Sequence, residues 1–366
     1  TLCARTGRRA LVLTGDEREA QRLADDLAAM GMRPLVYPLR DFNFRDTAGS
    51  SHEYEHQRLQ VLSRLLEPAP EGCDCVVACV DAALQYVLPP QELKSRIRAF
   101  HPGDEVPPEE IIRLLVRCGY EESDQIEGPG QFAHRGGILD FFTPNASLPT
   151  RLEFWGDEID TINAFDPETQ RRTDEPLEEV TIAPAREVVI DDPSALVEKI
   201  RKLASSLRGK AAPAARTFLH AEADKLDSGL SISCADKYLP LLYDSPVTLL
   251  GYFDPENTLL FVSEPARVKE RMRSTQWQWG EDCKGYLMEG VLCRGLDTYA
   301  GDWVWLTGQY EAFGTVFLDV FAHGTYDVPV RTLANVTARQ LSVWGGSTEL
   351  LSEDLRAMLH NRTACI

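Results

Sequence analysis

Two arginines and a tryptophan in residues 131–167 are the side chains best suited to recognising another molecule. This stretch reads QFAHRGGILDFFTPNASLPTRLEFWGDEIDTINAFDP and contains Arg135, Arg151 and Trp155. Arginine offers a planar fork of hydrogen-bond donors that matches carboxylates, and tryptophan offers a large apolar ring with one polar edge. Both residue types are enriched among the side chains that contribute most to protein–protein binding. We therefore expect a protein-binding surface that includes these three residues.

Alternating hydrophobicity indicates that the same stretch forms antiparallel strands. In residues 150–155 the apolar side chains fall on one face, whereas Arg151, Glu153 and Trp155 fall on the other. Turn-forming residues separate the alternating runs at 136–137, 144–145 and 156–157. The pattern predicts a small sheet with one buried face and an opposite face that carries the two arginines and the tryptophan.

A structural explanation of these residues stays open at this point. Arg135 and Arg151 would pair with Glu153 and Asp157, and Trp155 would cover an edge of the sheet. Residue types alone favour this explanation, because charged faces of sheets are usually solvated and internally paired.

The order of residues in this stretch resembles the second domain of bacterial transcription-repair coupling factors. The strings that carry the resemblance are G-Q-F-A-x-R-G-G-I-L-D-x-F, L-P-x-R-L-E-F-x-G-D-E-I-D-x-I and F-D-P-x-T-Q-R. The excision-repair protein UvrB has a related domain, and in both families it is the docking module for UvrA, a damage-recognition ATPase. The resemblance implies that Arg135, Arg151 and Trp155 contact UvrA, and it favours a binding surface over the structural explanation. Position 155 is commonly phenylalanine in the family, and tryptophan keeps the aromatic face.

An α/β pattern flanks the β-rich stretch on both sides. Before it, buried parallel strands are predicted at 9–14, 35–37 and 74–80, with helices at 16–30 and 51–66. After it, helices are predicted at 193–207, 211–227, 265–283 and 352–359, and strands at 247–253, 257–262, 302–306 and 315–321. The pattern predicts an α/β fold whose parallel-sheet domain is interrupted by a mostly antiparallel β insertion. The resemblance to UvrB implies that this parallel-sheet domain is a degenerate, helicase-like (P-loop type) one.

The family resemblance implies a division of the chain into four parts. Residues 1–104 would form the first half of a UvrB-like α/β domain (1A), and residues 105–190 the β-rich UvrA-binding insertion domain (2). Residues 191–335 would form the second half of the α/β domain (1B). Residues 336–366 would be a linker and the truncated start of a next domain.

The strings that bind and hydrolyse nucleotides are missing from this sequence. No P-loop of the form G-x-x-x-x-G-K-[ST] occurs. The strand that should end in two acidic residues reads LLFVSEP, so that Ser263 stands where a metal-organising carboxylate is needed. We therefore predict no catalytic residue, metal or cofactor in this chain. The resemblance implies that ATP and Mg²⁺ act in motor domains elsewhere in a parent protein, an ATP-dependent DNA translocase of helicase superfamily 2.

Histidines and cysteines offer weaker signals of a metal site. His52 and His56 lie four residues apart on a predicted helix, a spacing that could bind a metal, but we expect a solvated polar face instead. The nine cysteines include no C-x-x-C pair. We expect them to be buried free thiols in a reducing cytosol.

Composition restricts the classes of partner and the compartment. A net charge of −19 argues against an autonomous DNA-binding protein, because phosphates are bound by clustered lysine and arginine. The chain has no apolar run of eighteen residues and no signal-peptide pattern, so we expect a cytoplasmic location and no membrane contact. It begins directly before a strand, as an excised piece of a longer protein would.

The resemblance implies UvrA as the partner of this chain, and RNA polymerase and DNA as partners of domains outside it. We expect the fragment itself to be monomeric. The alternative function is a DNA-binding or ATP-dependent motor domain of a UvrB- or helicase-type protein. UvrB, to which the resemblance extends, clamps one DNA strand with a β-hairpin rich in aromatic residues. The corresponding region 40–51 is short in this sequence and contains only Phe42 and Phe44, which argues against a DNA clamp.

Overall fold

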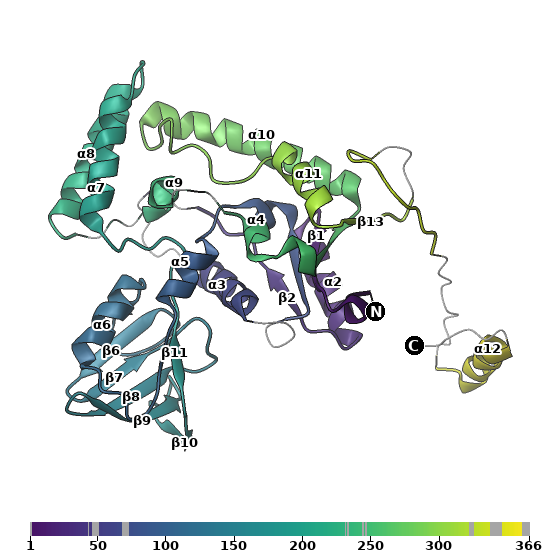
Figure 1. Ribbon diagram of the computed structural model, residues 1–366, viewed down its shortest axis with the longest axis horizontal. Helices are drawn as coiled ribbons and strands as arrows, with labels where there is room; N and C mark the ends of the chain where they lie inside the picture. Colours follow the sequence, from purple (N-terminus) through teal and green to yellow (C-terminus); the bar gives the residue numbers. More distant parts are fainter. Residues whose placement is uncertain are drawn as a thin grey trace. The chain divides into compact units, whose positions relative to one another are not determined.

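The computed structural model describes most of the chain, in two compact units, Thr1–His323 and Gly324–Ile366 (Figure 1). The described residues are 2–42, 44–45, 51–67, 73–230, 232, 234–243, 245, 247–321, 326–336 and 346–360. Among them, no helix combines the length and the apolar character needed to span a bilayer. The first unit contains two large sheets, one parallel and one antiparallel.

A five-stranded parallel sheet carries the α/β part of the first unit (Figure 1). Its strands follow the order β13-β12-β1-β3-β2, with Leu11 of β1 beside Val76 of β3 and Leu260 of β12. The central strands are buried along nearly their whole length, which explains their continuous apolar sequence. The strands are β1 (Arg9–Thr14), β2 (Pro34–Tyr37), β3 (Cys75–Cys79), β12 (Thr258–Ser263) and β13 (Val316–Leu318).

Helices connect these strands and pack on the sheet. The N-cap of the first long helix is Asp16, whose side chain accepts a hydrogen bond from the Glu19 amide at 2.8 Å. The longest helix ends at Gly290, which adopts the left-handed conformation with φ of 77°. The helices are α1 (Leu2–Thr6), α2 (Glu17–Ala29), α3 (Glu53–Leu66), α4 (Val80–Leu84), α5 (Pro90–Arg96), α10 (Pro265–Glu289) and α11 (Trp303–Ala312).

A helical hairpin, α7 (Pro193–Ser206) and α8 (Ala212–Asp227), packs with α10 on a second core. Aromatic side chains from distant parts of the chain complete this core, among them Phe44, Trp279 and Tyr299. Short helical segments lie nearby in sequence: η1 (Ala235–Tyr238), α9 (Leu239–Leu242), η2 (Leu249–Tyr252) and η3 (Pro255–Asn257).

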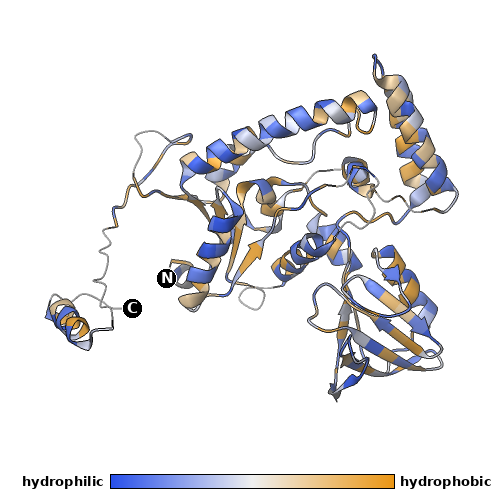
Figure 2. Cartoon of the chain, turned by 180° about the vertical axis from the view of Figure 1, so that it is seen from behind, coloured by the Kyte–Doolittle hydropathy of each residue, from blue (hydrophilic) through white to orange (hydrophobic). Residues whose placement is uncertain are grey.

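A six-stranded, mostly antiparallel sheet follows the order β10-β9-β8-β7-β6-β5 (Figure 1). One face packs against α6 (Pro108–Arg117) around Phe141, Leu152 and Ile162, which are fully buried. Figure 2 shows hydrophobic residues along the strands of both sheets. The strands are β5 (Glu121–Glu122), β6 (Gln131–Arg135), β7 (Ile138–Phe141), β8 (Thr150–Trp155), β9 (Glu158–Phe165) and β10 (Arg172–Pro176). At its base, β4 (Arg98–Phe100) pairs with β11 (Val180–Ile182).

The predicted mixed α/β fold, with one parallel and one antiparallel sheet, is confirmed, but two predicted strands are wrong. Residues 247–253 contain the 3₁₀ helix η2, and residues 302–306 begin helix α11. The bulky aromatic and β-branched residues of 303–305 favour a strand on propensity alone. The helix forms because the Asp302 carboxylate accepts a hydrogen bond from the Trp305 amide at 2.8 Å. In the second unit, the predicted helix is present as α12 (Thr348–His360).

Candidate protein-binding site

Strand register places Arg135, Arg151 and Trp155 on the same face of the antiparallel sheet. Arg135 pairs with Ile138, and Asp140 pairs with Arg151, so these side chains point to one side. The register of β8 against β9 shifts after Glu153, but β8 itself keeps its alternation. Trp155 therefore stays on the side of Arg151. We call this side the outer face, since it lies opposite the core formed with α6.

Two of the predicted contact residues are open to solvent. The Trp155 side chain is 83% exposed at the end of β8, directly before the turn at Gly156. Arg135 is exposed at the end of β6, and it makes no hydrogen bond or ion pair with another residue of the described ranges. Trp155 and Arg135 are therefore both accessible to a partner on the outer face.

Arg151 is more enclosed than the other two. Its Nε and Nη2 atoms donate hydrogen bonds of 2.7 and 2.8 Å to the two carboxylate oxygens of Asp140. The guanidinium also lies 4.8 Å from the centre of the Phe165 ring. The bonds to Asp140 raise the pKa of Arg151 above its usual value. The predicted alternative pairing with Glu153 or Asp157 is thus wrong for Arg151.

The outer face is not uniformly solvated. A small hydrophobic cluster covers its end beside Arg151 and contains Ile126, Ala133, Phe142 and Phe165. Alternation within single strands does not reveal this cluster, because Ile126 comes from the loop before β6. Glu153 pairs at 3.3 Å with Arg172 of β10, a residue that sequence reasoning did not connect with the site.

A shallow hollow of about 410 Å³ adjoins Arg135 at the edge of the sheet. Its lining alternates in charge, since Glu122 and Asp124 face the same space as Arg135; the remaining lining residues are Ser123, Ala133 and His134. The hollow shows that the surface around Arg135 is concave rather than flat.

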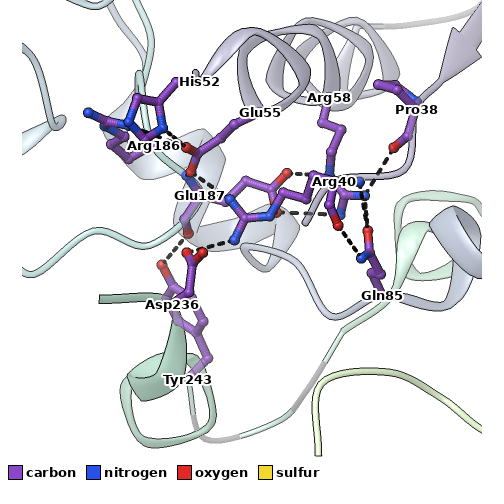
Figure 3. Close-up of polar contacts among 10 residues, drawn as sticks. All are labelled: Pro38, Arg40, His52, Glu55, Arg58, Gln85, Arg186, Glu187, Asp236 and Tyr243. Atoms are coloured by element: carbon purple, nitrogen blue, oxygen red, sulfur yellow. Dashed lines mark hydrogen bonds and ion pairs between the residues drawn. The ribbon is translucent and has the colours of Figure 1, made fainter. Parts of the chain in front are cut away.

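A buried ion network joins the exit of the antiparallel sheet to the α/β part (Figure 3). Arg58 of α3 donates to both carboxylate oxygens of Glu187, and neither side chain is exposed. Arg40 forms ion pairs with Glu55 at 2.9 Å and with Asp236 at 2.8 Å. The Glu55 carboxylate also accepts a hydrogen bond of 2.7 Å from the backbone amide of Glu187. The network thus connects four segments of the chain that are far apart in sequence.

Charge balance makes this burial tolerable. Burial alone raises the pKa of Glu55, but the attraction of Arg40 and the bond with His52 hold it well below its usual value. The carboxylates of Asp236, Glu187 and Glu55 raise the pKa of Arg40, although burial acts in the opposite direction. Gln85 bridges the two arginines, since its side chain accepts from Arg58 at 2.6 Å and donates to the Arg40 carbonyl at 2.6 Å. Each charge therefore depends on the others for compensation.

His56 lies at the same junction and should make stability depend on pH. The pKa of His56 is lowered to about 4, mainly by burial. Arg186 and His52 also lower this pKa, whereas the attraction of Glu55 opposes the shift. The unfolded chain then binds a proton below about pH 6.5 that the folded protein binds only near pH 4. We expect the free energy of unfolding to fall by about 2 kcal/mol between pH 7.5 and 4 on this account, after allowance for solvent screening.

Urea unfolding at several pH values measures this effect. His56→Gln should flatten the decline between pH 6.5 and 4, whereas His220→Gln, at an exposed position on α8, should not. Equal pH dependence in the wild type and His56→Gln would contradict the assignment.

No group of three or more metal-ligating side chains forms around His52 and His56, or elsewhere in the described ranges.

The carboxyl edge of the parallel sheet is where α/β proteins of this type bind phosphates. The connections of β1 and β12 diverge there, and helix α2 begins. The backbone amide of Glu19 already donates a hydrogen bond to the Asp16 side chain. The Glu19 carboxylate accepts a hydrogen bond of 2.8 Å from the Ser263 hydroxyl. A Cβ on Gly15 would lie 3.2 Å from the Cβ of Arg267, so the turn after β1 approaches the start of α10 closely. A phosphate at the start of α2 would meet the Glu19 carboxylate.

The aromatic residues of region 40–51 point into the protein. Phe44 is 4% exposed, and its ring centre lies 4.7 Å from that of Tyr299. Phe42 packs on the same ring at 5.3 Å. Residues 43 and 46–50 of this loop lie outside the described residues.

The eight cysteines that are described are free thiols, and all but Cys3 are buried.

Comparison with known proteins identifies the antiparallel sheet. Residues 99–188, which contain Arg135, Arg151 and Trp155, match the family described as the UvrB interaction domain. The chain is thus a protein that carries a UvrB interaction domain within an α/β framework.

Whole-chain relatives are more specific. The chain is 29% identical to the transcription-repair-coupling factor of Bacillus subtilis over 364 residues, 97% of this chain and 30% of the relative. The corresponding proteins of Mycobacterium bovis and Haemophilus influenzae are 30% and 29% identical over 71% and 68% of this chain, and 21% of each relative is covered. The chain belongs to the transcription-repair-coupling factor family and corresponds to its N-terminal, UvrB-like region. It spans less than a third of the length of these relatives.

Proposed function

We propose that this chain is a non-catalytic adaptor that recruits UvrA during transcription-coupled nucleotide excision repair. The observation that carries the proposal is that Trp155 and Arg135 are exposed on the same outer face of a UvrB interaction domain, with no ion pair to Arg135 among the described residues. Tryptophan and arginine are the residue types enriched among the hot spots that dominate protein–protein binding energy. UvrA is the partner that the family resemblance implies, and RNA polymerase and DNA would be bound by parts of a parent protein outside this chain.

We propose further that the α/β part is a helicase-like fold without ATPase activity. The occupied amide at the start of α2 and the carboxylates at the sheet edge support this, because both oppose a phosphate. In this proposal the chain uses no metal or nucleotide, and ATP-driven translocation belongs to the rest of the parent. The divisions at 104/105, 190/191 and 335/336 remain part of the proposal.

A binding titration with purified UvrA tests the adaptor function. We expect Trp155→Ala and Arg135→Ala each to weaken binding by about thirtyfold or more, which corresponds to about 2 kcal/mol for an interface hot spot. The matched control is Trp277→Ala, since Trp277 is also exposed (66%) but lies on α10. Unchanged affinity of a folded Arg135→Ala/Trp155→Ala double variant would refute the proposal.

Nucleotide and DNA binding test the alternative function. We expect ATP with Mg²⁺ to leave the melting temperature unchanged and duplex DNA not to bind at physiological salt. Salt-dependent DNA binding or measurable ATP hydrolysis by this chain would favour a motor or clamp instead.

A further inference from the structure

We infer that Asp140 is a positioning residue of the outer face, where it holds the Arg151 side chain in place. This inference rests on the proposed binding of UvrA and specifies how the face works. Asp140 lies next to Arg151 across β7 and β8, and its side chain is 7% exposed. It is enclosed beneath the face and therefore acts on a partner through Arg151.

The contact geometry fixes which donors of Arg151 remain for a partner. A guanidinium has five N–H groups, and the bonds from Nε and Nη2 to Asp140 use one side of the fork. The Phe165 ring contacts the planar group at 4.8 Å and limits its rotation. The donors that remain are on Nη1 and the second N–H of Nη2. A partner carboxylate or carbonyl would bind there end-on, in an orientation set by Asp140.

Electrostatics separates the roles of the two arginines. The Arg151–Asp140 pair is neutral as a unit, so it attracts an acidic partner only at short range. Arg135 has no ion-pair partner among the described residues, but Glu122 and Asp124 line the same hollow and offset its charge at longer range. The face thus fits a partner that presents a carboxylate to Arg135 and a shorter-range acceptor to Arg151.

The same pairing complicates the simplest mutational test. Removal of Arg151 alone leaves the enclosed Asp140 carboxylate without its cation. A loss of binding by Arg151→Ala would then combine a lost contact with a local disturbance. Variants at both positions are needed to separate these effects.

A double-variant cycle measured by titration with UvrA tests the inference. Asp140→Asn keeps the volume but removes the charge that holds Arg151, and we expect it to weaken binding about tenfold. Arg151→Gln should weaken binding at least as much. The double variant should bind no more weakly than Arg151→Gln, because Asp140 acts through Arg151. Asp160→Asn, at an exposed carboxylate of β9, is the matched control and should bind like the wild type.

A second measurement reads the position of Arg151 without UvrA. In the wild type the Nε–H signal of Arg151, assigned by its loss in Arg151→Gln, should be protected from solvent exchange. Asp140→Asn should abolish this protection while the melting temperature stays close to that of the wild type. Wild-type affinity in Asp140→Asn, additive losses in the double variant, or an unprotected wild-type signal would each overturn the inference. Failure of the wild type itself to bind UvrA would instead overturn the proposed function, and with it any docking role of Asp140.

Discussion

Replacement of Glu187 by alanine is expected to lower the free energy of unfolding by about 3–5 kcal/mol, the cost of breaking a buried ion pair. Glu187 is fully buried and is the carboxylate that Arg58, also fully buried, contacts through Nε and Nη2. Arg40 lies 3.7 Å from the same carboxylate. The variant would leave both guanidinium groups with less compensation in a region that excludes water. Chemical denaturation at pH 7 measures the change directly.

A matched substitution separates this effect from the loss of a glutamate as such. Glu198→Ala removes an exposed carboxylate on α7 and should change stability by about 0.5 kcal/mol or less, as surface substitutions usually do. Glu187→Gln, which keeps the shape and one acceptor, should fall between the two. If Glu187→Ala unfolds at the same denaturant concentration as Glu198→Ala, the network contributes no net stability.

Replacement of Gly290 by alanine should cost about 3 kcal/mol through two separate effects, left-handed backbone strain and overpacking. Gly290 has a φ of 77°, a conformation that side chains with a Cβ disfavour. A Cβ there would also lie 2.6 Å from the backbone nitrogen of Ala215 in α8. Backbone inside a helix cannot move aside without loss of packing between α10 and α8. Thermal and chemical denaturation both report the loss.

Gly229 provides the control for backbone strain alone. Its φ of 74° is nearly the same, but a Cβ on Gly229 would meet no atom within 4 Å. Gly229→Ala should therefore cost about 1 kcal/mol, the strain of a left-handed alanine. Equal losses at the two positions would show that the approach of α10 to α8 is looser than the structure indicates.

The outer face illustrates what single-strand patterns can predict. Alternation along 150–155 placed Arg151 and Trp155 together correctly, because side chains of a strand alternate whatever its neighbours are. The pattern could not predict that Asp140 neutralises Arg151, since that contact depends on the register between β7 and β8. Nor could the pattern predict that Ile126 packs against the outer face, because Ile126 comes from a loop.

The ion network lies further beyond the reach of sequence. Arg40 and Asp236 are separated by 196 residues, and neither stands out from other charged residues in the sequence. Local propensity also failed at residues 302–306, where one capping carboxylate outweighed the β preference of Trp303 and Trp305. Patterns within an element were reliable, whereas contacts between elements required the structure.

The pairing of β4 with β11 determines how the β-rich segment is connected to the α/β part. Arg98 lies opposite Ile182, and Phe100 opposite Val180, so the chain entering the matched segment 99–188 pairs with the chain near its exit. A segment whose first and last strands pair with each other is joined to the rest of the chain by two connections that lie close together. The residues between β4 and β11 therefore need no long connection to the α/β part.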